Sequence, residues 1–263
     1  MKSEVRHLAD KYQFFHWHLT FPDVFRIPEG NRAENEQTGW NGGFDAVLGN
    51  PPWEHTELKE KEFFATSRPD IANARTGAIR KRMIAALADD DPTLYESFVD
   101  AKRESVGNSH LIQSSGSYPL CGRGRTNTYG IFSELNSLIM SNRGRVGCIV
   151  PSGIATDDTY KHFFSSIVKR KLLSSFFDFE NQGVFFPEVH RNYKFCLLTL
   201  SGSSYQQSSA RFLFFGEKVG DVADGELTFE LTPNDIDLFS PNTLPNGRFV
   251  YTSARPSFFT ACA

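Results

Sequence analysis

Short apolar runs that stop at turn-forming residues recur along the chain and predict buried strands. They cover residues 44–49, 145–150, 174–179 and 193–200. Between the second and third runs, apolar residues at helical spacing predict a helix over about 157–172, capped by Asp157 or Asp158. This order of strands and helices is typical of a parallel α/β sheet, and we expect the last two strands to pair antiparallel across a loop.

Two further stretches have helical periodicity. The first runs from Tyr129 to Ile139 and is followed by Asn142-Arg143-Gly144, so we expect Gly144 to be its C-cap. The second lies between 57 and 113, is rich in charge, and breaks at the Asp-Asp-Asp-Pro of 89–92. This stretch predicts a helical insertion in the sheet. With the loop that follows, the insertion spans 57–125.

The pattern divides the chain into three parts. Residues 1–43 are a lead-in segment, which ends in a polar and glycine-rich stretch. Residues 44–215 form the predicted core, including the helical insertion. Residues 216–263 are rich in proline and asparagine from Thr232 onward, and we interpret them as a linker rather than as core.

Composition and charge exclude several classes of protein. Of the 263 residues, 40 % are hydrophobic, which is typical of a globular chain and not of a disordered or fibrous one. The net charge is −3, so any affinity for nucleic acid requires a local basic patch. No apolar run approaches the roughly 18 residues of a membrane span, and the first residues lack the apolar stretch of a signal peptide. We expect a soluble, cytoplasmic protein.

Cysteine spacing gives no sign of a metal or redox site. The chain has four cysteines and no Cys-x-x-Cys pair, so we interpret them as reduced packing residues. His16 and His18 have the i, i+2 spacing of a metal-binding pair. We interpret it as two ordinary histidines on a strand, because no third ligand lies nearby in the sequence.

The strongest chemical signal is Asn50-Pro51-Pro52-Trp53, directly after the apolar run 44–49. In open α/β sheets, ligands bind outside the carboxyl ends of the strands. Proline has no N–H, so the two prolines offer carbonyl acceptors in a fixed direction, and Asn50 adds a side-chain oxygen. These acceptors suit a planar amino group, and Trp53 gives a face on which a heterocycle stacks. The alternative is a turn that only ends a strand.

These residues carry a family resemblance. The run FDAVLGNPPWE resembles the catalytic motif of gamma-class adenine-N6 DNA methyltransferases, including those of Type IIG restriction-modification enzymes and BREX phage-exclusion systems. The resemblance implies the C-terminal half of a Rossmann-like methyltransferase, with a mixed α/β sheet and a helical insertion. It also implies S-adenosylmethionine as cofactor, double-stranded DNA as partner, and an adenine flipped out of the duplex. Such an enzyme would serve a restriction-modification or phage-defence system.

The resemblance assigns roles within the motif Asn50, Pro51, Pro52 and Trp53. The Asn50 side-chain oxygen and the Pro51 carbonyl accept from the N6 amino group, Trp53 stacks on the base, and Asn50 also borders the cofactor. Further matches follow in the family's order: residues 15–25 resemble the lead into the motif, and 144–157 a later strand and loop.

Two other segments resemble parts of the family's site. Residues 127–132 resemble the helix start that closes the cofactor pocket, which implies cofactor contacts for Asn127 and Tyr129. Helix capping and core packing are the alternative roles for these two residues. Residues 184–187 resemble the loop whose aromatic residue stacks on the other face of the adenine. We assign that role to Phe186, with Phe185 as the alternative, and core packing is an equal alternative because phenylalanine doublets recur along the chain.

One family element is missing from the sequence. Gamma-class enzymes carry a Phe-x-Gly-x-Gly cofactor loop before the motif, and residues 1–49 contain no such sequence. We therefore expect a truncated enzyme, with the remaining N- and C-terminal parts of the full-length protein, including a target-recognition domain, as partners.

Basic residues in and after the insertion are candidates for contacts with DNA phosphates. They are Arg75, Arg80, Lys81, Arg82, Arg123 and Arg125. A solvated helix face is the more ordinary interpretation of such a run.

Two other functions compete with methyl transfer. Asp45 with Glu57-Leu58-Lys59 has the acid and acid-x-Lys order of metal-dependent nucleases, although we expect the second part to lie on a charged helix. The stronger competitor is a catalytically inactive remnant that binds DNA or a partner subunit. Cofactor binding distinguishes this remnant from an enzyme.

Overall fold

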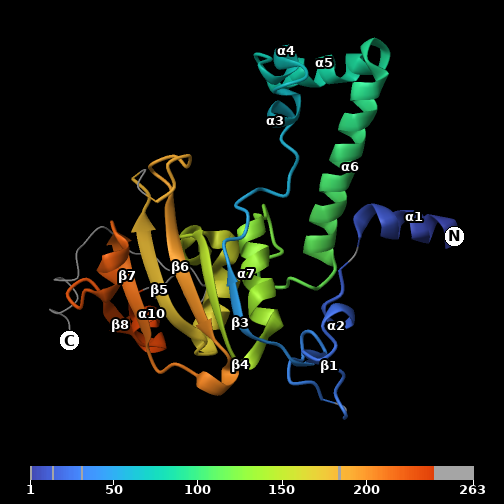
Figure 1. The fold of residues 1–263 in the computed structure, drawn as a ribbon. Coiled ribbons are helices and arrows are strands. Elements are labelled where there is room, and N and C mark those ends of the chain that lie inside the picture. The colour runs from blue at the N-terminus through green and yellow to red at the C-terminus, as the bar shows by residue number, and fades with distance from the viewer. Residues whose placement is uncertain (1, 14, 31, 183–184, 240–263) are drawn as a thin grey trace.

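The centre of the molecule is a six-stranded mixed sheet, seen in a computed structural model that describes residues 2–13, 15–30, 32–182 and 185–239. Its strand order is β3-β4-β6-β5-β7-β8 (Figure 1). The strands are β3 (Phe44–Gly49), β4 (Met140–Pro151), β5 (Leu173–Glu180), β6 (Lys194–Ser201), β7 (Ala210–Gly216) and β8 (Phe229–Leu231).

Strand directions confirm the predicted α/β class and make the sheet mixed. β3 runs parallel to β4, and β5 runs parallel to β7. The pairs β4–β6, β5–β6 and β7–β8 are antiparallel. The expected antiparallel pairing of the strands 174–179 and 193–200 is therefore confirmed.

Two helices next to the sheet differ in their ends from the sequence prediction. α7 (Thr128–Ile139) passes directly into β4 at Met140, so Gly144 lies within a strand and is not a C-cap. A Cβ on Gly144 would lie 2.6 Å from the Phe44 carbonyl oxygen, so this glycine permits close approach of β3. α9 (Lys161–Lys169) is shorter than the predicted 157–172, and its N-cap is Tyr160.

The predicted cap residues of that helix instead belong to the preceding segment. α8 (Gly153–Thr156) and the 3-10 helix η1 (Asp158–Tyr160) occupy the stretch before α9, and Asp157 joins them. Neither aspartate caps α9, because the chain makes a 3-10 turn before the helix begins. Phe163, Phe164 and Ile167 of α9 are buried in the main core against the sheet.

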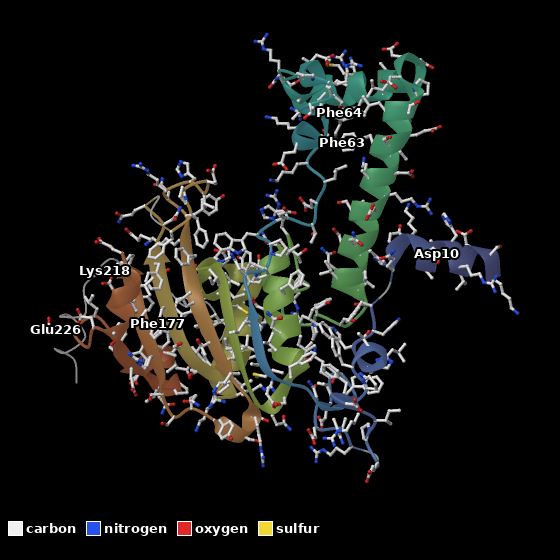
Figure 2. All side chains as sticks on the ribbon, viewed as in Figure 1. Asp10, Phe63, Phe64, Phe177, Lys218 and Glu226 are labelled. Carbon is white, nitrogen blue, oxygen red and sulfur yellow. The ribbon has the colours of Figure 1, made fainter. Side chains whose placement is uncertain are left out.

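The predicted insertion forms a helical arm that rises from one end of the sheet (Figure 1). It contains α3 (Glu60–Phe64), α4 (Pro69–Ala72), α5 (Gly77–Asp90) and α6 (Pro92–Ser114). The arm has its own core, in which Phe64, Ile71 and Leu87 are almost fully buried, and Figure 2 shows Phe63 and Phe64 inside it. The 23 residues of α6 give a length of about 35 Å.

The break at 89–92 in the sequence is a helix boundary. The Asp91 carboxylate accepts a hydrogen bond from Leu94 N at 3.1 Å, which caps α6, and Pro92 occupies the first turn. Thr76 caps α5 in the same way through Ile79 N at 3.2 Å. Local capping chemistry therefore explains why the arm turns where it does.

The lead-in segment packs against the end of β3. It contains α1 (Lys2–Tyr12), α2 (Trp17–Thr20), β1 (Phe25–Arg26) and β2 (Asn41–Gly42), and β1 pairs antiparallel with β2. Trp17, Phe21 and Phe25 form an aromatic cluster with Phe44 of β3, with ring centroids 5.2–5.7 Å from Phe44. Among the described residues, no helix is long and apolar enough to cross a membrane.

The segment after residue 215 is more ordered than the predicted linker. After η2 (Ser203–Tyr205) and β7, the 3-10 helix η3 (Val219–Ala223) leads to β8, which adds a sixth strand, and α10 (Pro233–Phe239) follows. Ile236 of α10 is only 1 % exposed and belongs to the main core. The linker interpretation is therefore wrong for 229–239, because Leu231 and Ile236 bury apolar surface, and residues 240–263 lie outside the described residues.

β3 is an edge strand, not the buried strand that its apolar sequence predicts. Its only partner is β4, so one side of its backbone is unpaired in the described sheet. Leu48 is 84 % exposed, and Asp45 and Ala46 are also exposed. Pairing on one edge only leaves this apolar strand without the cover that parallel strands normally have.

Candidate functional site

The Asn50–Trp53 motif lies at the carboxyl end of β3, next to the carboxyl end of β4. Because these two strands are parallel, residues 50–53 and 151–153 meet at the same end of the sheet. A cleft of about 790 Å³ opens there, between this sheet end, the base of the helical arm and the β5–β6 loop. Its walls include Trp53, Asn127, Tyr129, Ser152 and Lys194.

The start of α7 holds the segment that contains Trp53. Residues 54–56 run antiparallel beside 126–128, with a β-bridge between His55 and Asn127. Thr128 N donates to Glu54 O at 2.8 Å, and the hydroxyls of Thr56 and Thr126 lie 2.8 Å apart. The motif is therefore fixed to α7 rather than left as a loose loop after a strand.

Asn50 and Pro51 differ in exposure. Asn50 is exposed, and its carboxamide has no hydrogen-bond partner among the described residues. Pro51 is buried, and within the same described residues its carbonyl accepts no hydrogen bond. The Pro52 carbonyl, in contrast, accepts from the Thr128 hydroxyl at 2.6 Å. The two acceptors that the sequence analysis singled out therefore have no hydrogen-bond partner among the described residues, unlike the Pro52 carbonyl.

The structure brings the two predicted stacking residues together. The ring centroids of Trp53 and Phe186 lie 5.7 Å apart at an interplanar angle of 74°. Phe186 also packs on Phe195, with centroids 5.1 Å apart, so its core-packing role is real as well. Phe185 packs on Phe179 and Phe195, with centroids 5.4 and 5.2 Å away. Phe186 rather than Phe185 is thus the ring that contacts Trp53, and the two rings touch edge to face without a gap for a base.

Trp53 has one unsatisfied polar atom. Its indole Nε1 is buried and has no hydrogen-bond partner among the described residues. A buried donor without an acceptor costs about 1–3 kcal/mol, so such groups are uncommon. The indole therefore has a hydrogen bond to offer if the site rearranges.

The loop that carries Phe186 is held by a residue that the sequence analysis missed. The Asn181 side chain is fully buried, accepts from Phe186 N, and donates to Phe186 O and Val189 O, each at 2.9 Å. Asparagine after a strand is a common turn residue, but its partners five and eight residues away cannot be read from spacing alone.

Asn127 and Tyr129 are tied into a buried tyrosine pair. Asn127 N donates to the Tyr160 hydroxyl at 3.0 Å, and the Asn127 side chain caps α7 by accepting from Tyr129 N at 3.3 Å. Burial raises the pKa of Tyr160 to about 12 and raises the pKa of Tyr129 still further. Both phenols are therefore neutral hydrogen-bonding groups at ordinary pH, and helix capping is a demonstrated role of Asn127.

A buried carboxylate lies behind the cleft wall. Ser152, which lines the cleft at the end of β4, donates from its hydroxyl to Asp178 of β5. The other carboxylate oxygen of Asp178 accepts from Phe215 N at 3.3 Å, and Asp178 is fully buried. The sequence analysis missed Asp178 because it sits in a run of phenylalanines and gives no signal of its own.

Two of the three residues predicted to contact S-adenosylmethionine line the cleft. Asn127 and Tyr129 line the cleft, whereas Asn50 lies on the exposed edge and is not part of its wall. The Asn127 backbone N–H is already bonded to Tyr160. The described residues therefore do not fit a complete cofactor pocket. They also contain no group of three or more metal-ligating side chains.

The sequence around the motif matches a known protein family. Residues 2–84, which include the whole motif and its lead-in, match the family model "Eco57I restriction-modification methylase". This chain is similar to restriction-modification methylases. Among curated proteins, no match is found.

Solved structures with similar folds also come from restriction-modification systems. They include a type I methyltransferase subunit from Streptococcus thermophilus, with 10 % identity, a TM-score of 0.43, and coverage of 80 % of this chain and 39 % of that one. A modification subunit of a putative type I restriction enzyme from Vibrio vulnificus YJ016 has 12 % identity, a TM-score of 0.44, and coverage of 82 % and 39 %. The type IIG restriction endonuclease BpuSI has 14 % identity, a TM-score of 0.41, and coverage of 77 % and 20 %. The chain spans less than half the length of each.

The basic residues of this methylase-like chain fall into two groups. Arg75, Lys81 and Arg82 are exposed and lie in or just before α5, and Figure 1 shows α5 at the far end of the arm. Arg80 differs from them: its side chain is 11 % exposed, and its guanidinium donates to Ile71 O at 3.3 Å. Packing within the arm thus leaves Arg80 less available to a ligand than its neighbours.

Arg123 and Arg125 lie after α6, in the loop that leads to α7. Both are exposed, Arg125 lines the cleft, and its guanidinium lies 3.3 Å from Glu57. Arg123 donates to Pro119 O at 2.9 Å. The six predicted DNA contacts therefore form no single patch, since the arm separates the two groups.

The structure also places the residues of the competing metal-site and nuclease interpretations. His18 lies in α2, so the histidine pair is not on a strand as expected, and its ring stacks on Trp40 with centroids 4.2 Å apart. Asp45 lies near the amino end of β3, whereas Glu57 and Lys59 line the cleft beyond its carboxyl end, just before α3. The structure does not bring the acid and acid-x-Lys groups together.

Proposed function

We propose that this chain carries the target-base site of an adenine-N6 DNA methyltransferase of a restriction-modification or phage-defence system. One observation carries the proposal: Asn50 and Pro51 keep free acceptors at the carboxyl end of β3, while Trp53 faces Phe186 at the mouth of the same end. The match of residues 2–84 to a restriction-modification methylase family supports it.

In this proposal, Asn50 and Pro51 bind the exocyclic amino group of the base. The Asn50 side-chain oxygen and the Pro51 carbonyl each accept one amino hydrogen, which leaves the nitrogen lone pair directed away from the ring plane. Neutral amide acceptors suit this task because they hold the amino group without taking its proton before the transfer. Asparagine and proline carbonyls therefore orient the nucleophile rather than act as a strong base.

Trp53 and Phe186 bind the faces of the flipped base. Base–aromatic stacking contributes about 1–3 kcal/mol per base and tolerates different sequences around the target. Because the two rings now touch edge to face, a base enters only after Phe186 turns away from Trp53. We propose that base entry separates the rings.

The methyl donor in the proposal is S-adenosylmethionine, which supplies an electrophilic methyl group when bound. Because the described residues do not form its complete pocket, we propose that part of the pocket comes from further polypeptide docked on the unpaired edge of β3. That edge is apolar, with Leu48 84 % exposed, and it ends at Asn50. A parallel strand added there would bring its own carboxyl end next to Asn50.

The proposed substrate is double-stranded DNA, contacted through phosphates by the exposed basic residues of the arm. These residues lie in or just before α5, which adjoins the far end of α6, and α6 is about 35 Å long, close to one helical turn of B-DNA. DNA bound in the cleft would thus reach the end of the arm one turn away.

An inactive binding module is the second candidate function. The observation that favours it is the incomplete cofactor pocket, since Asn50 does not line the cleft that Asn127 and Tyr129 line. In that case the chain binds DNA or a partner subunit and transfers no methyl group.

The proposal is tested with a complete enzyme that contains this chain and the polypeptide that completes the donor pocket. This enzyme is incubated with S-adenosylmethionine and unmethylated genomic DNA, and the modified nucleosides are measured by mass spectrometry. The expected product is N6-methyladenine, lost in Asn50→Ala with DNA affinity unchanged. N4-methylcytosine would contradict the adenine specificity. A folded complete enzyme that binds DNA and S-adenosylmethionine without any transfer would favour the binding module, and calorimetric titration of this chain with S-adenosylmethionine decides whether it binds the donor alone.

A further inference from the structure

We infer that Thr128 is a positioning residue for Trp53 in the target-base site, an inference that rests on the proposed function. Thr128 is the first residue of α7 and lies beside the motif in space. Its hydroxyl donates to Pro52 O at 2.6 Å and accepts from Glu54 N at 3.1 Å. These two partners are the residues immediately before and after Trp53.

The main chain of Thr128 adds a third bond to the same short segment. Thr128 N donates to Glu54 O at 2.8 Å. Together the three bonds fix the peptide groups on both sides of Trp53, so the direction of its side chain follows from the position of Thr128. A hydroxyl can donate and accept at once, which neither a valine nor an alanine side chain can do.

The helix end that carries Thr128 is itself rigid. Asn127 caps α7 with its side chain, and Asn127 N donates to the hydroxyl of Tyr160, which is 2 % exposed. The Tyr160 ring fits under α7 because Gly130 has no side chain: a Cβ there would lie 2.1 Å from the ring. The main chain around Trp53 is therefore anchored, through Thr128, to a buried and well-packed part of the core.

Thr126 offers a neighbouring contact that ties the same segments without touching Trp53. Its hydroxyl lies 2.8 Å from that of Thr56, three residues beyond Trp53. If attachment of the two segments were all that mattered, loss of either hydroxyl would have the same effect. The specific claim is that the hydroxyl of Thr128 sets the orientation of the Pro52–Trp53 peptide.

The direct test uses Trp53 as its own reporter. The chain has three tryptophans, so Trp17→Phe and Trp40→Phe leave Trp53 as the only one. In that background, Thr128→Val should shift the Trp53 emission and increase its quenching by acrylamide, whereas Thr128→Ser should match the parent. Thr126→Val is the matched control and should leave both signals unchanged, and circular dichroism establishes that each variant is folded.

Methyl transfer by the complete enzyme that contains this chain provides the second measurement. A misplaced Trp53 should lower kcat by about 100-fold in Thr128→Val, with KM for DNA changed by less than about threefold and Thr128→Ser close to the parent. A rise in KM with kcat unchanged would overturn the positioning role.

The inference and the proposed function fail in different ways. An unchanged Trp53 signal in Thr128→Val, a serine variant that behaves like valine, or an equal effect of Thr126→Val would each overturn the inference. Absence of both transfer and adenine binding in every chain, the parent included, would contradict the proposed function, while Trp53 signals that separate valine from serine would still support the role of Thr128.

Discussion

The Asn181 side chain bonds both backbone groups of Phe186: its oxygen accepts from Phe186 N, and its nitrogen donates to Phe186 O, each at 2.9 Å. Phe186 thus receives from the end of β5 the same kind of support that Trp53 receives from α7. The two aromatic rings of the candidate base site are each held by one polar residue on a neighbouring element.

Asn181→Ala should destabilise the protein by about 1–3 kcal/mol, because the partly buried Phe186 N–H and the Val189 carbonyl lose the side chain that they bond. Urea unfolding followed by circular dichroism measures the free energy of unfolding. Asn108→Ala on the exposed face of α6 is the control and should stay within about 0.5 kcal/mol of the parent. Equal effects of the two substitutions would contradict the assigned role of Asn181.

Gly130→Ala should be costly although alanine favours helices. A Cβ at this position would lie 2.1 Å from the Tyr160 ring, so overpacking should cost about 1–3 kcal/mol and loosen the start of α7. Gly77→Ala at the start of α5 meets no atom within 4 Å and should be neutral or stabilising by up to about 1 kcal/mol. Thermal unfolding of both variants checks the contrast, and a neutral Gly130→Ala would show that Tyr160 packs elsewhere.

Tyr160 should make stability fall at alkaline pH. Burial raises the folded-state pKa of its hydroxyl from 10.0 to about 12, so the stabilisation is complete below pH 10 and is lost as the pH rises towards 12. Tyr160→Phe has no such group. The variant should be less stable than the parent at pH 8, because Asn127 N loses its acceptor, and this difference should shrink between pH 10 and 12. A constant difference in urea midpoint over that range would argue against burial of the hydroxyl.

The arm should contribute to DNA affinity through charge. In Lys81→Ala/Arg82→Ala, the slope of log Kd against log salt concentration should fall by about 1 for each DNA phosphate that the arm no longer neutralises. Lys169→Ala/Arg170→Ala removes two exposed basic residues at the end of α9 and should leave the slope unchanged. Arg80→Ala should instead lower stability, because Arg80 bonds Ile71 and Glu60 within the arm. Equal salt slopes in both double variants would exclude the arm from DNA binding.

Local patterns predict the parts of this fold that depend on near neighbours. The four apolar runs became strands, and the charged stretch around α5 and α6 became the arm, because Thr76 and Asp91 cap their helices through residues three positions away. The motif at Asn50 could be found because its chemistry lies in four consecutive residues.

Features that depend on distant partners could not be predicted from spacing. The apolar sequence of β3 predicts a buried strand, yet within the described residues it pairs with β4 alone and Leu48 is exposed. Thr128 acts on residues 76 and 74 positions away, and Asp178 bonds Ser152 from 26 positions away. Each of these interactions depends on how distant segments pack together, and the local sequence carries no signal for that packing.

Recognition of an adenine amino group by the Asn50–Trp53 site is the central claim, and a titration of Trp53 fluorescence tests it without knowledge of the DNA target sequence. In the Trp17→Phe and Trp40→Phe background, a short oligodeoxyadenylate should quench Trp53, and Asn50→Ala should weaken the binding. The same oligonucleotide built from N6,N6-dimethyladenine should bind more weakly, because it has no amino hydrogens to donate to Asn50 and Pro51. Equal titration curves for the two oligonucleotides would contradict the account.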